Sequence, residues 1–401
     1  MNKVYIVAAK RTAIGKFLGA LSTVSAADMA AAVIKNILAE TKINPARLDE
    51  VIVGNILMAG QKQGIARQAS VKGGIPHEVP AYGVNMICGS GMKTVINAYV
   101  GIKAGEANLI LAGGTESMST AGFVLPGTLR TGQKMTDFQV LDHMVTDGLT
   151  DAFSGCHMGV TAENIAVKFG ISRKAQDEFS LGSHQKAAAA IDAGRFKSEI
   201  VPIEISSKKE PIIFDTDEFV NRTTSVEKLS ALKPAFKRDG TVTAGNASGI
   251  NDGASFLLLA SERALEENGL VPMAEIIATG QGGVDPAIMG MGPVPAIANA
   301  LPKAGLHLRD IEIFELNEAF AAQSLAVLQQ LSDEHKVSCE WLKARCNLNG
   351  GGIALGHPIG ASGNRIAVSL VHELKRSRKK LGLAALCIGG GMGTALIIRN
   401  V

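Results

Sequence analysis

Residues 84–114, VNMICGSGMKTVINAYVGIKAGEANLILAGG, contain the pattern that decides the fold. An extended run leads into a glycine-rich turn at Cys88, and apolar residues then recur at helical spacing from Met92 until Gly105 ends the run. A buried strand is predicted over residues 109–112, directly before paired glycines. A turn, a helix and a strand in this order are typical of an α/β protein.

The same order of elements recurs near the end of the sequence. Residues 347–391 contain a glycine-rich turn, a helical pattern after Ser362, an apolar run over 383–388 and three consecutive glycines. Further apolar runs predict the strands that precede these two segments, at residues 4–9, 51–53, 274–278 and 311–314.

This repetition predicts an α/β fold built from two similar halves, residues 1–268 and 269–401. Residues 118–248 have no counterpart in the second half, and they are richer in polar and charged side chains. We interpret residues 118–248 as an inserted loop domain that lies over the first half.

The bulk composition excludes several classes of protein. The 401 residues are 46% hydrophobic and 19% charged, which is typical of a folded protein. A net charge of +3, with no concentrated basic face, argues against nucleic acid as a partner. The sequence has no apolar run long enough to cross a membrane and no secretory signal pattern, so we expect a cytoplasmic location.

The cysteines do not resemble a disulfide framework. Their number is odd, their spacing is irregular, and the sequence contains no C-x-x-C pair that would suggest zinc. We therefore expect free thiols and no metal site. The five residues are Cys88, Cys156, Cys339, Cys346 and Cys387.

Cys88 is the first candidate for a reacting group. It stands between an extended run and a helix, with Gly89 and Gly91 leaving room for a substrate near the backbone. The positive end of a helix dipole lowers the pKa of a thiol, so we expect a reactive thiolate. The alternative is a buried structural cysteine.

Three further segments carry polar groups beside glycine-rich turns. His357 lies in a glycine-rich run before a helix, where it can deprotonate a thiol or donate to an oxyanion, although a surface loop histidine is the alternative. Cys387 ends an apolar strand, and Gly389 after it could offer an N–H to an oxyanion. Asn317 could cap a helix or hold a water molecule.

The glycine run that begins at Gly389 does not match a dinucleotide site. That fingerprint needs a helix after the glycines, whereas residues 394–398 predict a strand.

Taken together, four motifs resemble the thiolase family. They are Cys88-Gly89-Ser90-Gly91, Asn317-Glu318-Ala319-Phe320, Gly356-His357-Pro358-Ile359-Gly360 and Cys387-Ile388-Gly389-Gly390-Gly391. The resemblance extends over nearly the whole chain and is specific because the motifs keep their order and spacing. It implies the thiolase fold, with two repeated α/β halves and a loop domain.

The resemblance also implies a role for each reacting group. Cys88 would be acylated, and His357 would take its proton. Cys387 would act as acid and base at the α-carbon of a second acetyl-CoA. Asn317 would hold a water that forms, with His357, an oxyanion hole for the enolate. The N–H groups of Cys88 and Gly389 would form a second hole.

By the same resemblance, the substrates would be acetyl-CoA, acetoacetyl-CoA and CoA, with no other cofactor. His157-Met158-Gly159 is similar to the short-chain members of the family. The family pattern also implies a homotetramer, with residues 119–145 as its tetramerisation loop. Residues 221–225 align poorly with the family's adenine-phosphate contacts, so we assign none there. The implied substrate-binding residues are Leu149, His157, Met158, Phe236, Ala244, Ser248, Met289, Ala319 and Phe320.

Two other functions remain open from the sequence. The chain could be a 3-ketoacyl-CoA thiolase for longer chains, which a rate series over acyl length would distinguish. It could instead be a non-catalytic acyl-CoA or lipid carrier on a thiolase scaffold, although such a carrier could dispense with the reacting groups. A related decarboxylating synthase would be expected to lack the second cysteine, Cys387.

Overall fold

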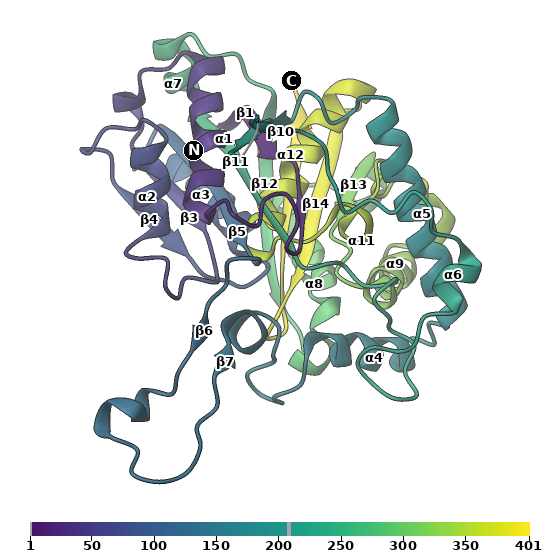
Figure 1. Ribbon diagram of the computed structural model, residues 1–401. Helices are drawn as coiled ribbons and strands as arrows, with labels where there is room; N and C mark the ends of the chain where they lie inside the picture. Colours follow the sequence, from purple (N-terminus) through teal and green to yellow (C-terminus); the bar gives the residue numbers. More distant parts are fainter. Residues whose placement is uncertain (1, 207–209) are drawn as a thin grey trace.

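A long mixed sheet runs through the computed structural model, which describes residues 2–206 and 210–401 (Figure 1). Its strands follow the spatial order β13-β14-β15-β12-β1-β11-β5-β3-β4. The bounds are β1 (Val4–Thr12), β3 (Glu50–Gly54), β4 (Ala81–Val84), β5 (Leu109–Ser117), β11 (Asn251–Ser261), β12 (Ala274–Gly283), β13 (Ile313–Leu316), β14 (Leu381–Ile388) and β15 (Met392–Asn400).

The predicted repeat is visible in the order of the strands. Read inward from one side, the sheet gives the edge strand β4 and then β3, β5, β11 and β1. Read inward from the other side, it gives β13, β14, β15 and β12, which match the last four strands of the first series. The two series meet where β1 pairs antiparallel with β12. The two halves are therefore related by an approximate two-fold axis, while the division at residues 268 and 269 stays a prediction.

The predicted strands at 4–9, 51–53, 109–112, 274–278 and 383–388 all fall within observed strands. The strand predicted at 311–314 begins two residues later, because a 3-10 turn over Leu308–Asp310 precedes it. Strands β4 and β11 were not predicted. Every residue of β11 is buried, so its sequence has no alternation between apolar and polar side chains.

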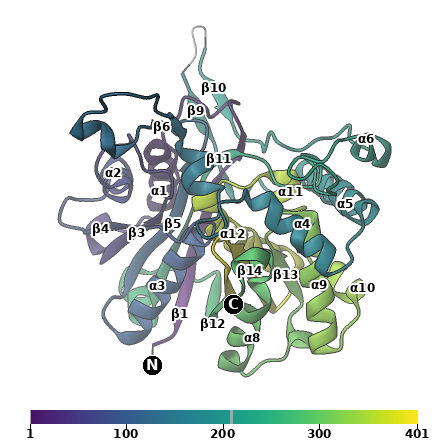
Figure 2. The same cartoon turned by 90° about the horizontal axis from the view of Figure 1, so that it is seen from below.

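The helices form layers on both faces of the sheet, as the perpendicular view shows (Figure 2). Alternate residues of a strand point to opposite faces. Thus Ala384 and Leu386 of β14 pack in a central cluster with α3 and α12, whereas Leu383 and Ala385 pack outward against α8 and α9. Helices α1 and α2 cover the outer face of the first half. The helices are α1 (Ala26–Thr41), α2 (Ile65–Lys72), α3 (Ser90–Ala104), α4 (Met158–Lys168), α5 (Arg173–Asp192), α6 (Val226–Ser230), α7 (Glu262–Asn268), α8 (Pro293–Ala304), α9 (Ala321–His335), α10 (Cys339–Lys343), α11 (Gly352–Leu355) and α12 (Ile359–Ser377).

The placement predicted for the inserted segment is only partly right. Strand β8 (Ile200–Val201) pairs with β1, and Ile203, Ile205 and Phe214 pack in the core cluster of the first half. Helices α4 and α5 pack against α9 and α11 of the second half, and not over the first half (Figure 1). The reason is an apolar match, because Ile165 of α4 joins the core cluster formed by α8, α9 and their strands. The segment starts and ends at neighbouring strands, since β5 pairs antiparallel with β11.

A long arm projects from the body of the molecule between β6 (Phe123–Val124) and β7 (Leu141–Asp142) (Figure 1). Its apolar side chains are largely exposed. They include Phe123, Leu125, Met135, Phe138 and Val140.

Four short strands complete the fold. Strands β2 and β8 extend the main sheet beside β11 and β1, and β9 pairs with β10 in a separate hairpin. None of the helices in the described residues is both long and apolar enough to cross a membrane. The bounds of the short strands are β2 (Gly15–Lys16), β8 (Ile200–Val201), β9 (Ile203–Ile205) and β10 (Ile212–Phe214).

Candidate active site

One cavity of about 550 Å³ brings Cys88, His357 and Cys387 together. Cys88 comes just before α3, His357 just before α12, and Cys387 at the end of β14. The substrate-binding residues implied by the sequence also line this cavity, so the structure gathers residues from both halves and the inserted segment. These are Leu149, His157, Met158, Phe236, Ala244, Ser248, Met289, Ala319 and Phe320.

Cys88 sits on a strained turn at the start of α3. Ile87 before it has a φ of +46°, a conformation that β-branched residues rarely adopt. Burial raises the pKa of the Cys88 thiol to about 11, although the N–H groups of Gly389 and Cys88 itself favour the thiolate. The expected lowering of this pKa by the helix dipole is therefore wrong, because desolvation outweighs it. At neutral pH the resting group is a thiol that needs a base.

His357 can supply that base. Its Nδ1 lies 2.6 Å from the hydroxyl oxygen of Ser362, and that hydroxyl donates its one proton to the carbonyl of Pro358 at 2.8 Å. Nδ1 must therefore carry a hydrogen and donate to Ser362, which leaves Nε2 with its lone pair free. Burial, together with the charge of Arg365, lowers the pKa of His357 to about 3, so the resting imidazole is neutral.

Cys387 lies close to Cys88 at the floor of the cavity. Burial and then the neighbouring Cys88 raise the pKa of the Cys387 thiol, so it also rests in the protonated form. The tight turn after it needs glycine. Gly391 has a φ of +85°, and a Cβ there would lie 2.2 Å from the carbonyl oxygen of Val284.

Two predicted residues, Asn317 and Gly389, are not among those that line the cavity. Gly389 directs its N–H toward the Cys88 sulfur. Asn317 accepts a hydrogen bond at Oδ1 from Nη2 of Arg365 at 3.3 Å. Its buried Nδ2 has no hydrogen-bond partner within the described residues. Nδ2 is therefore a donor that could bind an ordered water.

The floor of the cavity around Cys387 is apolar. Met158, Met289 and Phe320 are each less than a tenth exposed and form one cluster with Cys387. His157 stacks on Phe236 with ring centroids 4.7 Å apart. Its Nδ1 accepts the N–H of Gly159 and so caps α4. His157 thus fixes one wall through packing and capping.

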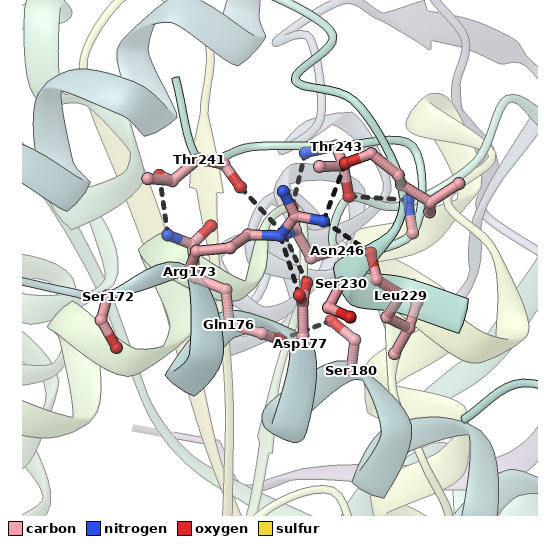
Figure 3. Close-up of polar contacts among 12 residues, drawn as sticks. Ser172, Arg173, Gln176, Asp177, Ser180, Leu229, Ser230, Thr241, Thr243 and Asn246 are labelled. Atoms are coloured by element: carbon pink, nitrogen blue, oxygen red, sulfur yellow. Dashed lines mark hydrogen bonds and ion pairs between the residues drawn. The ribbon is translucent and has the colours of Figure 1, made fainter. Parts of the chain in front are cut away.

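A buried polar network holds another wall, the segment from Thr241 to Ser248 (Figure 3). Asp177 of α5 accepts from Nε of Arg173 at 2.8 Å and from Nδ2 of Asn246 at 3.0 Å. Arg173 also donates through Nη2 to the carbonyl of Leu229 at the end of α6. The ion pair between Arg173 and Asp177 therefore joins α5 to α6 and to the segment from Thr241 to Ser248, which carries Ala244 and Ser248.

Sequence reasoning missed several residues around the cavity. Ser362 had a signal, because it lies in the same glycine-rich run as His357. Asn251 had a weaker one, and its Oδ1 accepts the backbone N–H of His357 at 2.9 Å. The apolar residues that line the cavity had no signal in the sequence, because burial beside a cavity produces no local pattern. They include Phe17, Met118, Phe219, Ala235, Ala247, Ile250 and Ile359.

A second cavity of about 290 Å³ shares Phe219, Ala244 and Ala247 with the first. Asn221 and Thr224 line it, although the sequence supported no assignment in residues 221–225. Lys228 adds a cation to the same cavity.

Comparison with known proteins agrees with this geometry. The family described as "Thiolase, N-terminal domain" matches residues 4–263, and "Thiolase, C-terminal domain" matches residues 270–400. The chain belongs to the thiolase family. This thiolase is 50% identical to an acetyl-CoA acetyltransferase of Allochromatium vinosum and 51% identical to one of Escherichia coli, in each case over the full length of both chains.

Solved thiolase structures share the whole fold. The Bacillus anthracis acetyl-CoA acetyltransferase has a TM-score of 0.95 at 42% identity, with 100% of this chain and 99% of that chain covered. Human mitochondrial 3-ketoacyl-CoA thiolase in complex with CoA has a TM-score of 0.93 at 43% identity, covering 100% and 98%. Overall similarity to these two structures therefore does not discriminate between short and longer acyl chains.

Proposed function

We propose that this thiolase is an acetyl-CoA C-acetyltransferase, which converts two acetyl-CoA into acetoacetyl-CoA and CoA and also catalyses the reverse. The observation that carries the proposal is the convergence of Cys88, His357 and Cys387 on one cavity. The names of the full-length bacterial relatives support the same activity.

The first half-reaction transfers an acetyl group to the enzyme. Nε2 of His357 takes the proton of Cys88 while the sulfur attacks the thioester carbonyl. The N–H groups of Cys88 and Gly389 stabilise the oxyanion. As the intermediate collapses, the Cys387 thiol gives its proton to the departing CoA sulfur. The products are acetyl-Cys88, free CoA, a Cys387 thiolate and a protonated His357.

The second half-reaction forms the carbon–carbon bond. The Cys387 thiolate removes a proton from the methyl group of a second acetyl-CoA. His357 and a water on Asn317 donate to the enolate oxygen. The enolate carbon attacks acetyl-Cys88, and the departing Cys88 sulfur recovers the proton held by His357. Every group then returns to its resting state. Because CoA leaves before the second acetyl-CoA reacts, we expect ping-pong kinetics.

The packing of the cavity floor supports a small acyl group. Met158, Met289 and Phe320 close the space around Cys387, which leaves little room for a long chain beside the reacting carbon. The main alternative is a 3-ketoacyl-CoA thiolase for longer chains, and the similarity to the human enzyme of that name is the observation in its favour.

The remaining expectations join the same proposal. The enzyme would need no cofactor besides its CoA substrates and would act in the cytoplasm. It would assemble as a homotetramer, and the exposed apolar arm between β6 and β7 is the feature that supports this assembly.

Thiolysis of acetoacetyl-CoA by CoA tests the function directly. We expect rapid turnover in the wild type and loss of turnover in Cys88→Ser. A preference for C8 over C4 substrates in the wild type would establish the longer-chain alternative. Failure of a folded wild type with every 3-ketoacyl-CoA would leave the acyl-CoA carrier as the remaining function.

A further inference from the structure

Arg365 of α12 is a buried cation with few partners. It is 1% exposed, and its hydrogen bond from Nη2 to Oδ1 of Asn317 is 3.3 Å long. Oε2 of Glu315 lies 3.8 Å from its Nη1, which is too far for a hydrogen bond. Nε and Nη1 have no hydrogen-bond partner in residues 2–206 and 210–401.

Arg11 shows what this fold does with a buried arginine whose role is structural. It is equally inaccessible, yet its Nε lies 2.7 Å from Glu199, and Nη1 and Nη2 lie 2.7 and 2.9 Å from the two oxygens of Asp217. Leaving buried donors of a cation unpaired is costly. The incomplete pairing of Arg365 therefore points to a role other than stability.

The location of Arg365 suggests what that role is. Glu315 and Asn317 are two residues apart at the end of β13, so their side chains point to the same side of the chain, toward α12. The charge of Arg365 also reaches His357, since it contributes to the lowered pKa of that imidazole. Arg365 thus lies beside both groups that would face the enolate oxygen.

Glu315 does not neutralise this charge effectively. Burial raises the pKa of the Glu315 carboxyl to about 8, so the carboxyl is largely protonated at neutral pH. The guanidinium therefore keeps a positive field in a part of the protein where water does not screen it.

We propose that Arg365 is a positioning residue for the carbon–carbon bond-forming half-reaction. Its Nη2 holds Oδ1 of Asn317, so that the Asn317 amide can only present its NH₂ group toward the enolate water. Its positive charge also favours the negative charge that develops on the enolate oxygen. The proposal rests on the proposed function and goes beyond it, because it separates the requirements of the two half-reactions.

The test measures the two half-reactions separately. Exchange of labelled CoA into acetyl-CoA reports acetyl transfer to Cys88, and thiolysis of acetoacetyl-CoA reports carbon–carbon bond chemistry as well. In Arg365→Met we expect thiolysis to fall about 100-fold, the usual effect of losing one oxyanion donor, while exchange falls less than about threefold. An equal loss in both reactions would overturn the proposal.

A double-mutant cycle with Asn317→Ala tests whether Arg365 acts through Asn317. We expect the double variant to lose little more thiolysis than either single variant, because both remove the same donor. Additive losses would show that the two residues act independently and would contradict the positioning role.

Two further variants keep the test decisive where Arg365→Met does not fold. Arg365→Lys keeps the charge without the planar fork, and we expect thiolysis to fall more than exchange. At pH 9, above the pKa of Glu315, we expect Glu315→Gln to catalyse thiolysis faster than the wild type, because a negative counter-charge is gone. A slower rate would overturn the proposal.

If the wild type catalyses neither reaction, the proposed function itself fails, which is a distinguishable result.

Discussion

The hydroxyl of Ser362 lies 2.6 Å from Nδ1 of His357 and donates its proton to the carbonyl of Pro358. This pair of contacts determines which nitrogen of the imidazole carries hydrogen. Since Nδ1 is the donor, Nε2 is available as a base for Cys88.

Removing the Ser362 hydroxyl is expected to weaken that base. In Ser362→Ala the imidazole loses the bond that fixes its tautomer and orientation, and we expect kcat/KM for thiolysis to fall about 10- to 100-fold. The rate of Cys88 alkylation by iodoacetamide should fall with it. Ser369→Ala is the matched control, because Ser369 is a buried serine on the same helix that bonds Glu199 instead. Equal activity in both variants would contradict the role of Ser362.

Cys387 is expected to matter unequally for the two half-reactions. In Cys387→Ala the base for the α-proton is lost, so we expect thiolysis and condensation to fall about 100- to 10,000-fold. Acetylation of Cys88 by acetyl-CoA, followed by mass spectrometry, should still be detected at a reduced rate, because its nucleophile and base remain while the acid that protonates the departing CoA is lost. Cys346→Ala removes another buried cysteine outside the cavity and should keep full activity. A Cys387→Ala enzyme that condenses acetyl-CoA normally would rule out this role.

Met289 is expected to limit the length of the acyl chain. It is 3% exposed and packs beside Cys387, so Met289→Ala enlarges the floor of the cavity. We expect the ratio of kcat/KM for 3-ketohexanoyl-CoA over acetoacetyl-CoA to rise about tenfold, at a stability cost of about 2–5 kcal/mol. Met291→Ala is the control, since Met291 is equally buried but packs in the second-half core. An unchanged ratio would mean that other residues set chain length.

The stability of the protein is expected to decrease in acid partly because of His357. Its pKa is about 3 in the folded state and about 6.5 when unfolded, so between these values the unfolded chain binds more protons. This difference lowers the free energy of unfolding as the pH falls, by about 2 kcal/mol at pH 5. Urea unfolding at pH 7 and pH 5 should therefore show a smaller acid loss in His357→Gln than in the wild type. Equal losses would show that His357 does not titrate between the two states.

The network in Figure 3 is expected to control CoA binding more than chemistry. In Asp177→Asn the bonds to Arg173 and Asn246 weaken. The segment from Thr241 to Ser248 is then held less firmly against α5. We expect KM for CoA to rise about tenfold with kcat nearly unchanged, because the wall binds the ground state and the transition state alike. Lys174→Met, which breaks an exposed ion pair on the same helix, is the control. A fall in kcat with unchanged KM would contradict this account.

Much of the fold could be predicted because its signals are local. Helical spacing after Cys88 and the apolar run at 383–388 depend on neighbouring residues alone, and both elements were found where predicted. The glycine-rich turns indicated where the chain approaches a ligand, and Cys88, His357 and Cys387 do line one cavity. The sequence thus determined the two α/β halves and singled out three residues, Cys88, His357 and Cys387, that line one cavity.

Only the tertiary structure decided how those groups behave. Desolvation sums over atoms from distant segments, so the high pKa of Cys88 could not follow from its place at a helix start. The packing of α4 and α5 on the second half depends on which apolar faces match in space. Helix α12 supplies the partners of two site residues: Ser362 contacts His357, and Arg365 contacts Asn317. The contact between Asn317 and Arg365 leaves no period in the sequence, because it joins residues of β13 and α12 that only folding brings together.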